Sequence, residues 1–299
     1  MPQNLNSLLH EGKDHGSQDY PIEYYLCHIP ETYNYLPAHW HEEMEIGMVA
    51  SGKVNYQIGD KEYTLSEGSL IFIAPNMLHS ASQLGKLPAE THSIVFHLKM
   101  AGLAENDRCA KHFIEPFQDG RLQPPPVIGP THPGYPDLLA TFRELWSYQE
   151  PRGGEELLVK AAILRLLYQL LQISEEPSTL TSTAELQYNS EKIKPVLSYI
   201  QDHYTEPMTI DELAGICGFS AVHFMNIFKK VIGATCMEYI IEYRIAMSTV
   251  ALKNTTAPIM KIAMDHGFQN ISYYNRTFRK KMGMTPTEYR KRLKSQTNG

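Results

Sequence analysis

The segment Gly267–Arg292 reads GFQNISYYNRTFRKKMGMTPTEYRKR, and it interleaves aromatic and basic residues over a short stretch. Tyr274, Phe278 and Met282 are spaced by four residues, so in a helix they lie on one face. The lysines and arginines between them then occupy the other faces. Gly267 suits a tight turn before this helix, because glycine adopts the left-handed conformation at little cost. The segment therefore predicts a turn followed by an amphipathic helix with a basic exposed surface.

The same pattern occurs once before in the chain. A shift of 49 residues, which becomes 50 after one inserted residue, aligns the two copies. The aligned pairs are Ile210–Ala214 with Ile259–Ala263, Gly218 with Gly267, Phe224 with Tyr274, Phe228 with Phe278, Lys229 with Arg279, and Glu238 with Glu288. So many matches in the same order indicate one structural unit that is used twice.

Each copy reads as a helix, a tight turn and a second helix. In the first copy Thr209 and Glu212 form a potential capping box, and Gly218 suits the turn. Ser220 can then cap the second helix. The corresponding signals in the second copy are Pro258, Gly267, Asn270 or Ser272, and a further capping box at Thr285–Glu288. The sequence predicts two helix-turn-helix units.

The charge of the chain is divided between its two parts. Residues 190–299 contain 15 Lys and Arg against 9 Asp and Glu, a net charge of +6, and the remainder contains 12 against 24, a net charge of −12. A basic region beside an acidic one favours contact between the basic part and a polyanion. A solvated basic surface is the alternative.

The spacing of the cysteines and the hydropathy of the chain indicate in which cell compartment the protein is located. The four cysteines lie far apart without a Cys-x-x-Cys pair, which argues against a disulfide framework and against a cysteine zinc site. The N-terminus has no apolar leader, and the longest apolar-rich run, residues 157–173, is interrupted by Lys160 and Arg165. We expect a cytoplasmic protein without a membrane segment.

The C-terminal pattern resembles that of the AraC-type transcriptional regulators over about residues 190–295. The family pattern GF-x-(x)-S-Y-F-x-R-x-F-(K/R)-K-x-x-G-x-(T/S)-P-x-x-(Y/F)-R is matched by GFQNISYYNRTFRKKMGMTPTEYR, with Tyr274 in place of the usual phenylalanine. The resemblance implies two recognition helices, joined by a long helix near Cys236–Asn254, that enter successive major grooves of DNA. It also implies base contacts from exposed positions of both helices, namely Val222, His223, Met225, Asn226, Ile271, Ser272, Asn275 and Arg276.

Basic and aromatic residues of these helices are expected to have different roles. The cations are expected at phosphates, which position a protein on DNA without specifying sequence: Lys229, Lys230, Arg279, Lys280 and Lys281. Arg276 suits a guanine edge. Asn226 departs from the arginine that is frequent at its position in the family, which leaves the base preference of the first helix open. The aromatic residues fall at buried spacing, so we expect them in the core.

Residues 1–136 have a different pattern. Short runs such as VNYQIG, KEYTLS, SLIFIA and SIVFHL are rich in β-branched and aromatic residues and are separated by turn signals. This predicts an antiparallel β architecture. His39, His41 and Glu45 are evenly spaced along a predicted strand and would therefore face one side, and His79 follows in a later segment.

These residues resemble the motifs of the cupin barrel. The first motif, His-x-His, three residues, Glu, six residues and Gly, falls on His39, His41, Glu45 and Gly52. The second is matched in outline by Gly68, Pro75 and His79, but it lacks a glycine and is one residue short. In cupin enzymes such residues hold a divalent metal, whereas AraC-type sensor domains often carry the same histidines without catalysis. A small-ligand site, a metal site and a purely structural role all remain open.

Small-ligand sensing, without a metal or cofactor, is the interpretation that we adopt. The predicted site residues are His39, His41, Glu45, His79, Tyr24, Tyr56 and His97. Hydroxyl and imidazole groups in an acidic, aromatic-lined pocket favour a sugar or polyol. Trp40 alternates away from the two histidines beside it, so we expect it to face outward.

The sequence thus predicts a multidomain α+β protein, with a cupin-like antiparallel β-barrel and flanking helices followed by an all-α domain with two helix-turn-helix units. The predicted boundaries are 1–136 for the ligand-sensing barrel, 137–173 for a two-helix dimerisation segment, 174–190 for a Ser/Thr/Glu-rich linker and 191–299 for the DNA-binding domain. The predicted homodimer seam is Leu157, Ala161, Leu164, Tyr168 and Leu171, whereas Leu158, Ile163, Leu167 and Leu170 are expected to pack on the barrel. The alternative is that the preceding helix covers the seam within one chain.

The predicted function is a ligand-responsive DNA-binding transcription regulator, not an enzyme. Its expected partners are double-stranded operator DNA, a small polar effector such as a carbohydrate, a second copy of the chain and RNA polymerase. One alternative is a metal-dependent cupin enzyme fused to a basic helical domain, which would contain stoichiometric metal. Another is an architectural DNA binder, which would show no sequence preference.

Overall fold

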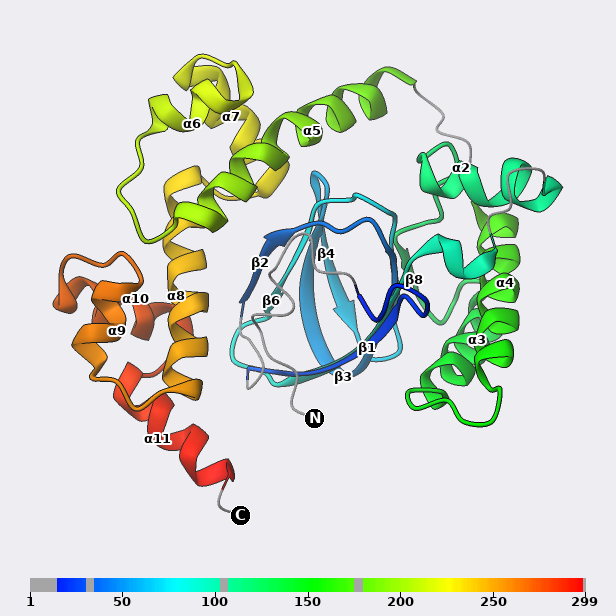
Figure 1. Ribbon diagram of the computed structural model, residues 1–299, viewed down its shortest axis with the longest axis horizontal. Coiled ribbons are helices and arrows are strands. Elements are labelled where there is room, and N and C mark those ends of the chain that lie inside the picture. The colour runs from blue at the N-terminus through cyan, green and yellow to red at the C-terminus, as the bar shows by residue number, and fades with distance from the viewer. Residues whose placement is uncertain (1–14, 31–34, 103–106, 175–179, 298–299) are drawn as a thin grey trace.

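The structure, a computed structural model, describes residues 15–30, 35–102, 107–174 and 180–297. Strands of the N-terminal part form a barrel in the centre of the molecule (Figure 1). Helices of residues 135–173 lie on one side of this barrel, and the helices that follow residue 180 lie on the other. None of the helices within the described residues has the length and apolarity that a bilayer crossing requires.

The barrel consists of two antiparallel sheets that share one long strand, β3 (Met44–Ile58). The first sheet has the order β1 (Ile22–Ile29), β7 (Ala89–Phe96), β3, β5 (Leu70–Ile73) and β8 (Val127–Ile128). The second pairs β3 with β4 (Lys61–Ser66) and β6 (His79–Gln83), and β6 with β2 (Tyr35–His39). A register shift in β3 between Val49 and Ser51 accompanies its passage from one sheet to the other. The predicted antiparallel β architecture is confirmed.

Side chains that alternate along β3 separate two apolar layers. Met44 and Ile46 face outward into a core that the flanking helices cover, whereas Val54 belongs to the core inside the barrel. Gly52 has a φ of +77°, and a Cβ added there would lie 2.3 Å from the carbonyl oxygen of Pro88. Only glycine fits at this close approach. The contact explains why the cupin-like motif has a glycine at position 52.

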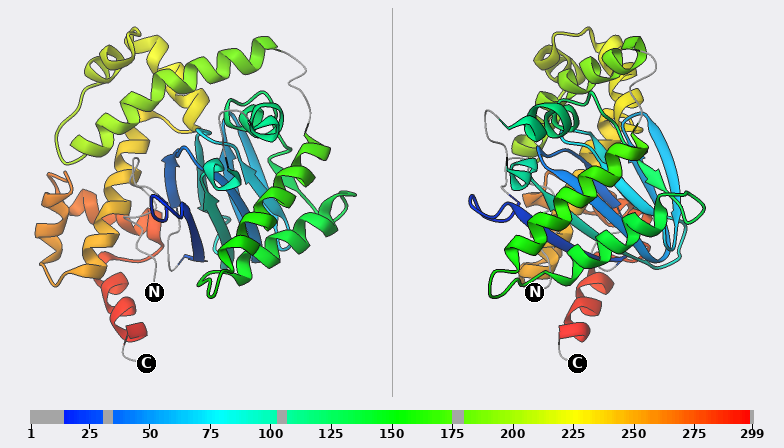
Figure 2. Two further views of the ribbon diagram at one scale, coloured as in Figure 1. Left: turned by 45° about the vertical axis from the view of Figure 1, so that its right-hand side comes forward. Right: turned by 90° about the vertical axis from the view of Figure 1, so that its right-hand side faces the viewer.

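Two helices cover the outer face of the first sheet, α3 (Tyr135–Ser147) and α4 (Glu156–Ile173). They run side by side across the strands (Figure 2). Phe142 of α3 and Ile163 of α4 are fully buried in one core with Ile46 of the sheet. The two helices predicted for this segment are present. Short helical elements precede them: η1 (Leu98–Ala101), η2 (Ala110–Ile114) and α2 (Glu115–Gln118).

The C-terminal helices form two helix-turn-helix units connected by a long helix. They are α5 (Leu180–His203), α6 (Ile210–Cys217), α7 (Ala221–Ile232), α8 (Cys236–Asn254), α9 (Ile259–Asp265), α10 (Ile271–Met282) and α11 (Pro286–Thr297). The first unit is α6 with α7, the second is α9 with α10, and α8 connects them. The predicted capping box at Thr209 and Glu212 is present. Asn270, one of two candidates, caps α10 by accepting a hydrogen bond from the Tyr273 amide.

Part of the predicted linker, residues 174–190, is helical. Residues 175–179 lie outside the described residues, but α5 already begins at Leu180. The segment after Pro177 contains Ala, Glu, Leu and Gln, which favour helices, and no further proline before residue 190. Richness in Ser and Thr indicated a linker, yet it does not prevent a helix. Residues 180–190 are therefore part of a helix that continues to His203.

The barrel and the C-terminal domain meet along β2 and α8. Leu36 and Ala38 of β2 share a buried core with Tyr239 of α8. The Tyr239 hydroxyl donates a hydrogen bond of 2.9 Å to the carbonyl oxygen of Ala38. Trp40 lies beside α5, where the Lys194 ammonium is 5.7 Å from its ring centroid. The segment around β2 is thus the platform on which the C-terminal helices dock.

Candidate functional site

The solvent-facing sides of α7 and α10 form the first candidate site. Each helix buries an aromatic stripe, Phe224 and Phe228 in α7 and Tyr274 and Phe278 in α10, and all four side chains are fully buried. The aromatic residues therefore fill the core, as their spacing predicted. Each helix is left with one polar or mixed face toward solvent.

The predicted base-reading positions are exposed, with one exception. The exposed residues are Val222, His223, Met225, Asn226, Ser272, Asn275 and Arg276. Ile271 is half-buried and packs against the core that contains Phe268 and Tyr274. As the first residue of α10, it packs part of its apolar side chain on this core and is less accessible to DNA than the other seven, and its contact with bases stays a prediction.

One of the predicted phosphate contacts has a different role. Lys229, Lys230, Arg279 and Lys280 are exposed. The Lys281 ammonium instead forms an ion pair with Glu242 of α8 and lies 6.0 Å from the ring centroid of Tyr35 in β2. Lys281 therefore links α10 to α8 and lies next to β2 of the barrel.

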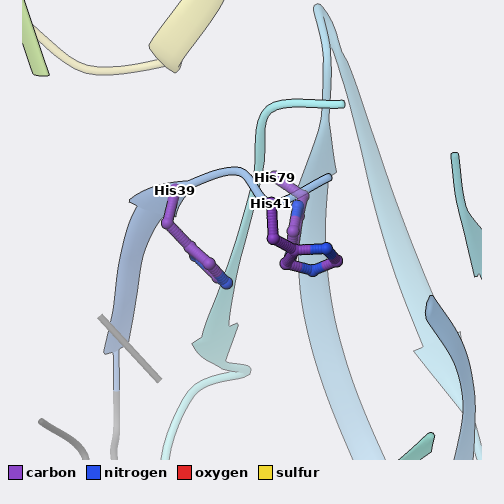
Figure 3. A group of neighbouring side chains, drawn as sticks. All are labelled: His39, His41 and His79. Carbon is purple, nitrogen blue, oxygen red and sulfur yellow. The ribbon is translucent and has the colours of Figure 1, made fainter. Parts of the chain in front are cut away.

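The second candidate site lies inside the barrel, where three imidazoles and one carboxylate meet. His39 ends β2, His41 lies in the connection that follows, Glu45 lies in β3 and His79 begins β6. The three rings point into the same space (Figure 3). The ring centroids of His39 and His79 are 4.1 Å apart, and Glu45 Oε2 lies 3.5 Å from Nε2 of both His41 and His79. We call these four residues the histidine cluster.

The residues of the histidine cluster lie on different elements from those predicted. Even spacing placed His39, His41 and Glu45 along one strand, but β2 ends at His39 and β3 begins only at Met44. The pairing of β2 with β6 is irregular just before His39, where Pro37 has no N–H to donate to the ladder. Two strands and a connection, rather than one strand, bring the three side chains together.

Backbone carbonyl groups orient all three rings. Each Nδ1 lies 2.9 or 3.0 Å from a carbonyl oxygen two residues away, His39 from Pro37, His41 from Glu43 and His79 from Met77. Because a carbonyl oxygen only accepts, each Nδ1 carries a proton. In a neutral ring the Nε2 then carries the lone pair. A neutral ring of the cluster therefore directs an Nε2 lone pair into the barrel.

Burial and neighbouring charges favour an ionised Glu45 and a neutral His39. Burial opposes ionisation of Glu45, but hydrogen bonds and charge from His41 and His79 outweigh it and hold the pKa of this carboxyl well below its usual range. Burial, reinforced by the neighbouring imidazoles of His79 and His41, holds the pKa of His39 well below its usual range. The cluster thus combines a carboxylate with at least one neutral imidazole.

Two predicted ligand residues lie elsewhere. The ring of Tyr24 is 6.0 Å from that of Trp146 in α3, on the outer face of the sheet. It faces outward because it alternates with Tyr25, whose side chain belongs to the inner core. His97 lies beyond the end of β7, and its Nδ1 accepts a hydrogen bond from the Lys99 amide at the start of η1. Neither prediction agrees with the structure.

Two residues that the sequence did not single out border the cluster. The ring of His15 lies 5.2 Å from that of His41, and His15 Nδ1 is 2.7 Å from the Tyr25 hydroxyl. Tyr56, which was predicted, is buried on the same side of the second sheet as His79. His15 precedes the first strand and belongs to no periodic pattern, so the sequence contained no signal for it. Tyr25 could have been found only from the register of β1.

The donor set fits a divalent metal ion. One donor atom from each of His39, His41 and His79 lies within 4.8 Å of the others. The Nε2 atoms of His41 and His79 are buried, and each lies 3.5 Å from Glu45 Oε2. His15, His41 and Glu43 form a second group with the same proximity. Imidazole nitrogens with a carboxylate oxygen suit first-row transition metals.

Comparison with known proteins gives matches along most of the chain. The profile described as an AraC-like ligand binding domain matches residues 23–187, more than half of the chain, and the profile described as a helix-turn-helix domain matches residues 207–292. The chain is 22% identical over 292 residues to the uncharacterized HTH-type transcriptional regulator YdeC of Bacillus subtilis, covering 97% of each chain. It is 26% identical over 284 residues to the melibiose operon regulatory protein of Escherichia coli, covering 90% of this chain and 87% of that one.

Among solved structures, ToxT from Vibrio cholerae aligns with a TM-score of 0.48 and 13% identity over 91% of this chain and 98% of that chain. The two profile matches place a ligand-binding domain before a helix-turn-helix domain. That order agrees with the barrel and the two repeated units of the structure. The matches favour a regulator and give no support to a cupin enzyme. The chain belongs to the AraC family of ligand-responsive, DNA-binding transcriptional regulators.

Proposed function

We propose that this regulator places α7 and α10 in successive major grooves of its operator DNA. The observation that supports this most is the structural repeat, because α7 and α10 are equivalent helices with exposed polar positions. Their connector, α8, has 19 residues and is therefore about 28 Å long. This is comparable with the ~34 Å rise of one turn of B-DNA. Because the protein acts on chromosomal DNA, we propose that it is located in the cytoplasm. Contact with RNA polymerase stays a prediction.

Selection and footprinting test the proposal. Full-length protein should enrich a defined sequence from a random duplex pool, and the enriched DNA serves as the operator fragment. Hydroxyl-radical footprinting should then show two protected stretches on one side of the duplex, about 10 base pairs apart. Binding should weaken roughly tenfold or more between about 50 and 200 mM salt as counterions are released. A single protected stretch, or no enrichment, would contradict the use of both helices.

We propose that the effector is a small polar metabolite, such as a sugar, that binds inside the barrel. Buried imidazole, carboxylate and tyrosine groups offer hydrogen-bond partners of the kind that recognise hydroxyl groups. A relative that aligns with 90% of the chain is named for the operon of a sugar, melibiose. This similarity supports a carbohydrate class, without specifying which carbohydrate.

A panel of sugars and polyols tests the effector class by thermal shift. A true effector should raise the melting temperature of the wild-type protein and change its affinity for the operator fragment. The double variant His39→Ala/His41→Ala should lose both responses. The matched variant His97→Ala should keep them, because His97 lies beyond β7. Equal responses in both variants would place the effector elsewhere.

We also propose that α4 forms a homodimer contact. Leu157, Leu164 and Tyr168 are 74%, 42% and 62% exposed and lie on one face of the helix, with Ala161 exposed between them. Single exposed apolar residues are common, but an apolar row of this length favours association. Leu158, which was expected to pack on the barrel, is exposed as well, because the adjacent Val159 takes the buried row.

The dimer is tested by light scattering. Leu157→Glu with Leu164→Glu should give a folded monomer with weaker operator binding, since both side chains are exposed in one chain. Gln172→Glu adds a negative charge at another exposed position of α4 and should leave the dimer intact. A double variant that stays dimeric would show that association uses a different surface.

A further inference from the structure

The turns of the two helix-turn-helix units differ in what surrounds their glycine. Gly218 and Gly267 are equivalent in the repeat, and both have a left-handed backbone, with φ values of +72° and +80°. A Cβ added at Gly218 would meet nothing within 4 Å. At Gly267 it would lie 2.8 Å from Arg244 Nε and 2.9 Å from the Tyr204 carbonyl oxygen. The first turn therefore needs glycine for its φ, whereas the second needs it also for a close approach.

Gly267 approaches a half-buried arginine of α8. Arg244 Nε donates a hydrogen bond of 2.6 Å to the carbonyl oxygen of Tyr204, and Arg244 Nη2 donates one of 2.7 Å to that of Glu206. Burial lowers the pKa of Arg244 from its ordinary value of 12.5. The two carbonyl oxygens replace part of the hydration that the guanidinium loses, and its planar fork fits both of them at once. We call Arg244, Tyr204, Glu206 and Gly267 the Arg244 junction.

The Arg244 junction joins parts of both helix-turn-helix units. Tyr204 and Glu206 lie in the connection that leads into α6 of the first unit, whereas Gly267 lies between α9 and α10 of the second. The ring of Tyr204 also lies 6.0 Å from that of His266, the residue before Gly267. Within the described residues, the buried cores of the two units have no residue in common. The units are thus connected at this junction as well as through the chain of α8.

We propose that Arg244 is a positioning residue, which fixes the orientation of α10 relative to α7 and thereby the spacing of the two DNA segments that these helices read. The proposal deepens the proposed function, on which its DNA part rests. One added base pair moves a DNA segment by about 3.4 Å along the duplex and by roughly 35° around it. Two rigidly connected units therefore accept one spacing. Loosely connected units accept several, but they bind each more weakly because binding must then order them.

Distance measurements without DNA test the junction itself. Full-length protein with Met225→Cys and Asn275→Cys carries spin labels at equivalent exposed positions of α7 and α10. Cys109→Ser removes the exposed native cysteine, and the other three are buried. An excess of unlabelled protein prevents distances between two labelled chains. Double electron–electron resonance should then give one narrow distance distribution.

Arg244→Lys should broaden this distribution roughly twofold, because lysine keeps the charge but lacks the planar fork that holds both carbonyl groups. The reciprocal change Lys253→Arg, at an exposed position of the same helix, should leave the width unchanged. Equal widths for Arg244→Lys and its parent protein would overturn the proposal.

The two glycines provide a matched pair of further variants. Gly267→Ala and Gly218→Ala both place a side chain at a left-handed φ and therefore introduce similar backbone strain. Only Gly267→Ala also presses on Arg244 and on the Tyr204 carbonyl group. It should broaden the distance distribution as Arg244→Lys does, whereas Gly218→Ala should not. Circular dichroism shows which variants are folded, and Arg244→Lys carries the test if an alanine variant is not. Equal broadening by both alanine variants would contradict the role of the junction.

Operator spacing tests the consequence for DNA binding. The selected operator fragment is compared with two forms that have one base pair inserted or deleted between the two protected stretches. Wild-type protein should lose roughly tenfold or more in affinity on either change, because one segment then leaves its recognition helix. Arg244→Lys should bind the original fragment about three- to tenfold more weakly than the wild type, but lose less than about threefold on either change.

An Arg244→Lys variant that loses as much as the wild type on these changes would overturn the proposal, since the residue would then affect stability alone. Wild-type protein with a narrow distance distribution but without dependence on operator spacing would instead contradict the proposed function. The distance measurement and the spacing measurement thus distinguish a failure of the junction from a failure of two-groove binding.

Discussion

The two helix-turn-helix units are copies of one motif, yet they are embedded differently. The first unit shares its core with the barrel, because Phe228 of α7, Tyr239 of α8 and Leu36 of β2 belong to one buried cluster. The second unit has a smaller core of its own around Phe278 and Tyr289. Two copies of one motif can therefore have different roles. Only a copy that packs on the barrel can pass a structural change from the barrel to DNA.

Their exposed surfaces differ as well. On α7, Val222 is 66% exposed and Met225 is 44% exposed, so this helix presents apolar groups, which suit contact with a thymine methyl group. On α10 the equivalent surface carries Ser272, Asn275 and Arg276, which suit hydrogen bonds to base edges. From this difference we propose that the second unit supplies most of the sequence discrimination and that the first unit provides the link to the sensor.

The largest effect is expected from the equivalent core phenylalanines. Phe228→Ala and Phe278→Ala should each cost about 3–5 kcal/mol of local stability, because both rings are fully buried. Hydrogen exchange should show faster exchange in α9–α11 only for Phe278→Ala. For Phe228→Ala it should also show faster exchange in β2, since the first unit shares its core with the barrel. Confinement of both effects to the mutated unit would break the comparison.

The second prediction concerns the recognition of DNA bases by α10 and α7. Arg276→Ala should lose about 1–3 kcal/mol of binding free energy on the selected operator and relax preference at one base pair. Asn226→Ala, at the equivalent position of α7, should lose less. Quantitative binding to the operator and to single-base variants measures both. A larger loss for Asn226→Ala would reverse the assignment of discrimination to the second unit.

The capping boxes at the starts of α6 and α11 should have similar effects. Thr209→Ala and Thr285→Ala should each cost about 0.5–2 kcal/mol, because each threonine accepts from the amide three residues on. Local exchange rates at the starts of α6 and α11 report this cost. The conservative change to Ser keeps the hydroxyl and should restore most of the stability. A cost at one of the two helices alone would show that the two caps do not contribute equally.

Adjacent lysines in α10 should separate DNA contact from interdomain contact. Lys280→Gln should reduce the slope of log affinity against log salt by about 1, as expected for one phosphate. Lys281→Gln should leave that slope unchanged, because its ammonium pairs with Glu242. Titrations of both variants at several salt concentrations provide the measurement. A slope change for Lys281→Gln would return this residue to the DNA-facing set.

The smallest effect is a shared pH dependence of the caps. Hydrogen bonds from the backbone and side chain of Thr209 and Thr285 lower the pKa of Glu212 and Glu288 from their ordinary value of 4.5. A lowered pKa contributes stability above the ordinary value, and this contribution is lost as the pH falls through the folded pKa. Exchange protection of both helix starts should be constant above about pH 5 and fall together below it. Protection that is lost at a higher pH at one helix start than at the other would show that the two carboxyl groups differ in folded pKa.

Local features were predictable from the sequence. The capping boxes, the Gly218 and Gly267 turns and the buried aromatic stripes depend on residues within a few positions of one another, and the structure contains them all. The cupin-like spacing selected His39, His41, Glu45 and His79 as neighbours. The first three were expected along one strand, but the four residues come from three strands and a connection. Alternation along β1 shows that Tyr24 and Tyr25 point to opposite faces of the sheet. It does not show which of them points into the barrel, because that depends on the pairing register of the strand.

The sequence by itself determined that this chain has two helix-turn-helix units, a β-rich sensor domain and a histidine motif, because periodicity and capping are short-range properties. Only the tertiary structure decided that His15 borders the cluster, that Lys281 pairs with Glu242 of α8 and that Ala38 contacts Tyr239. These contacts join residues that are far apart in the chain. Their formation depends on where each strand ends and on which faces pack together, and no local pattern of residues carries that information.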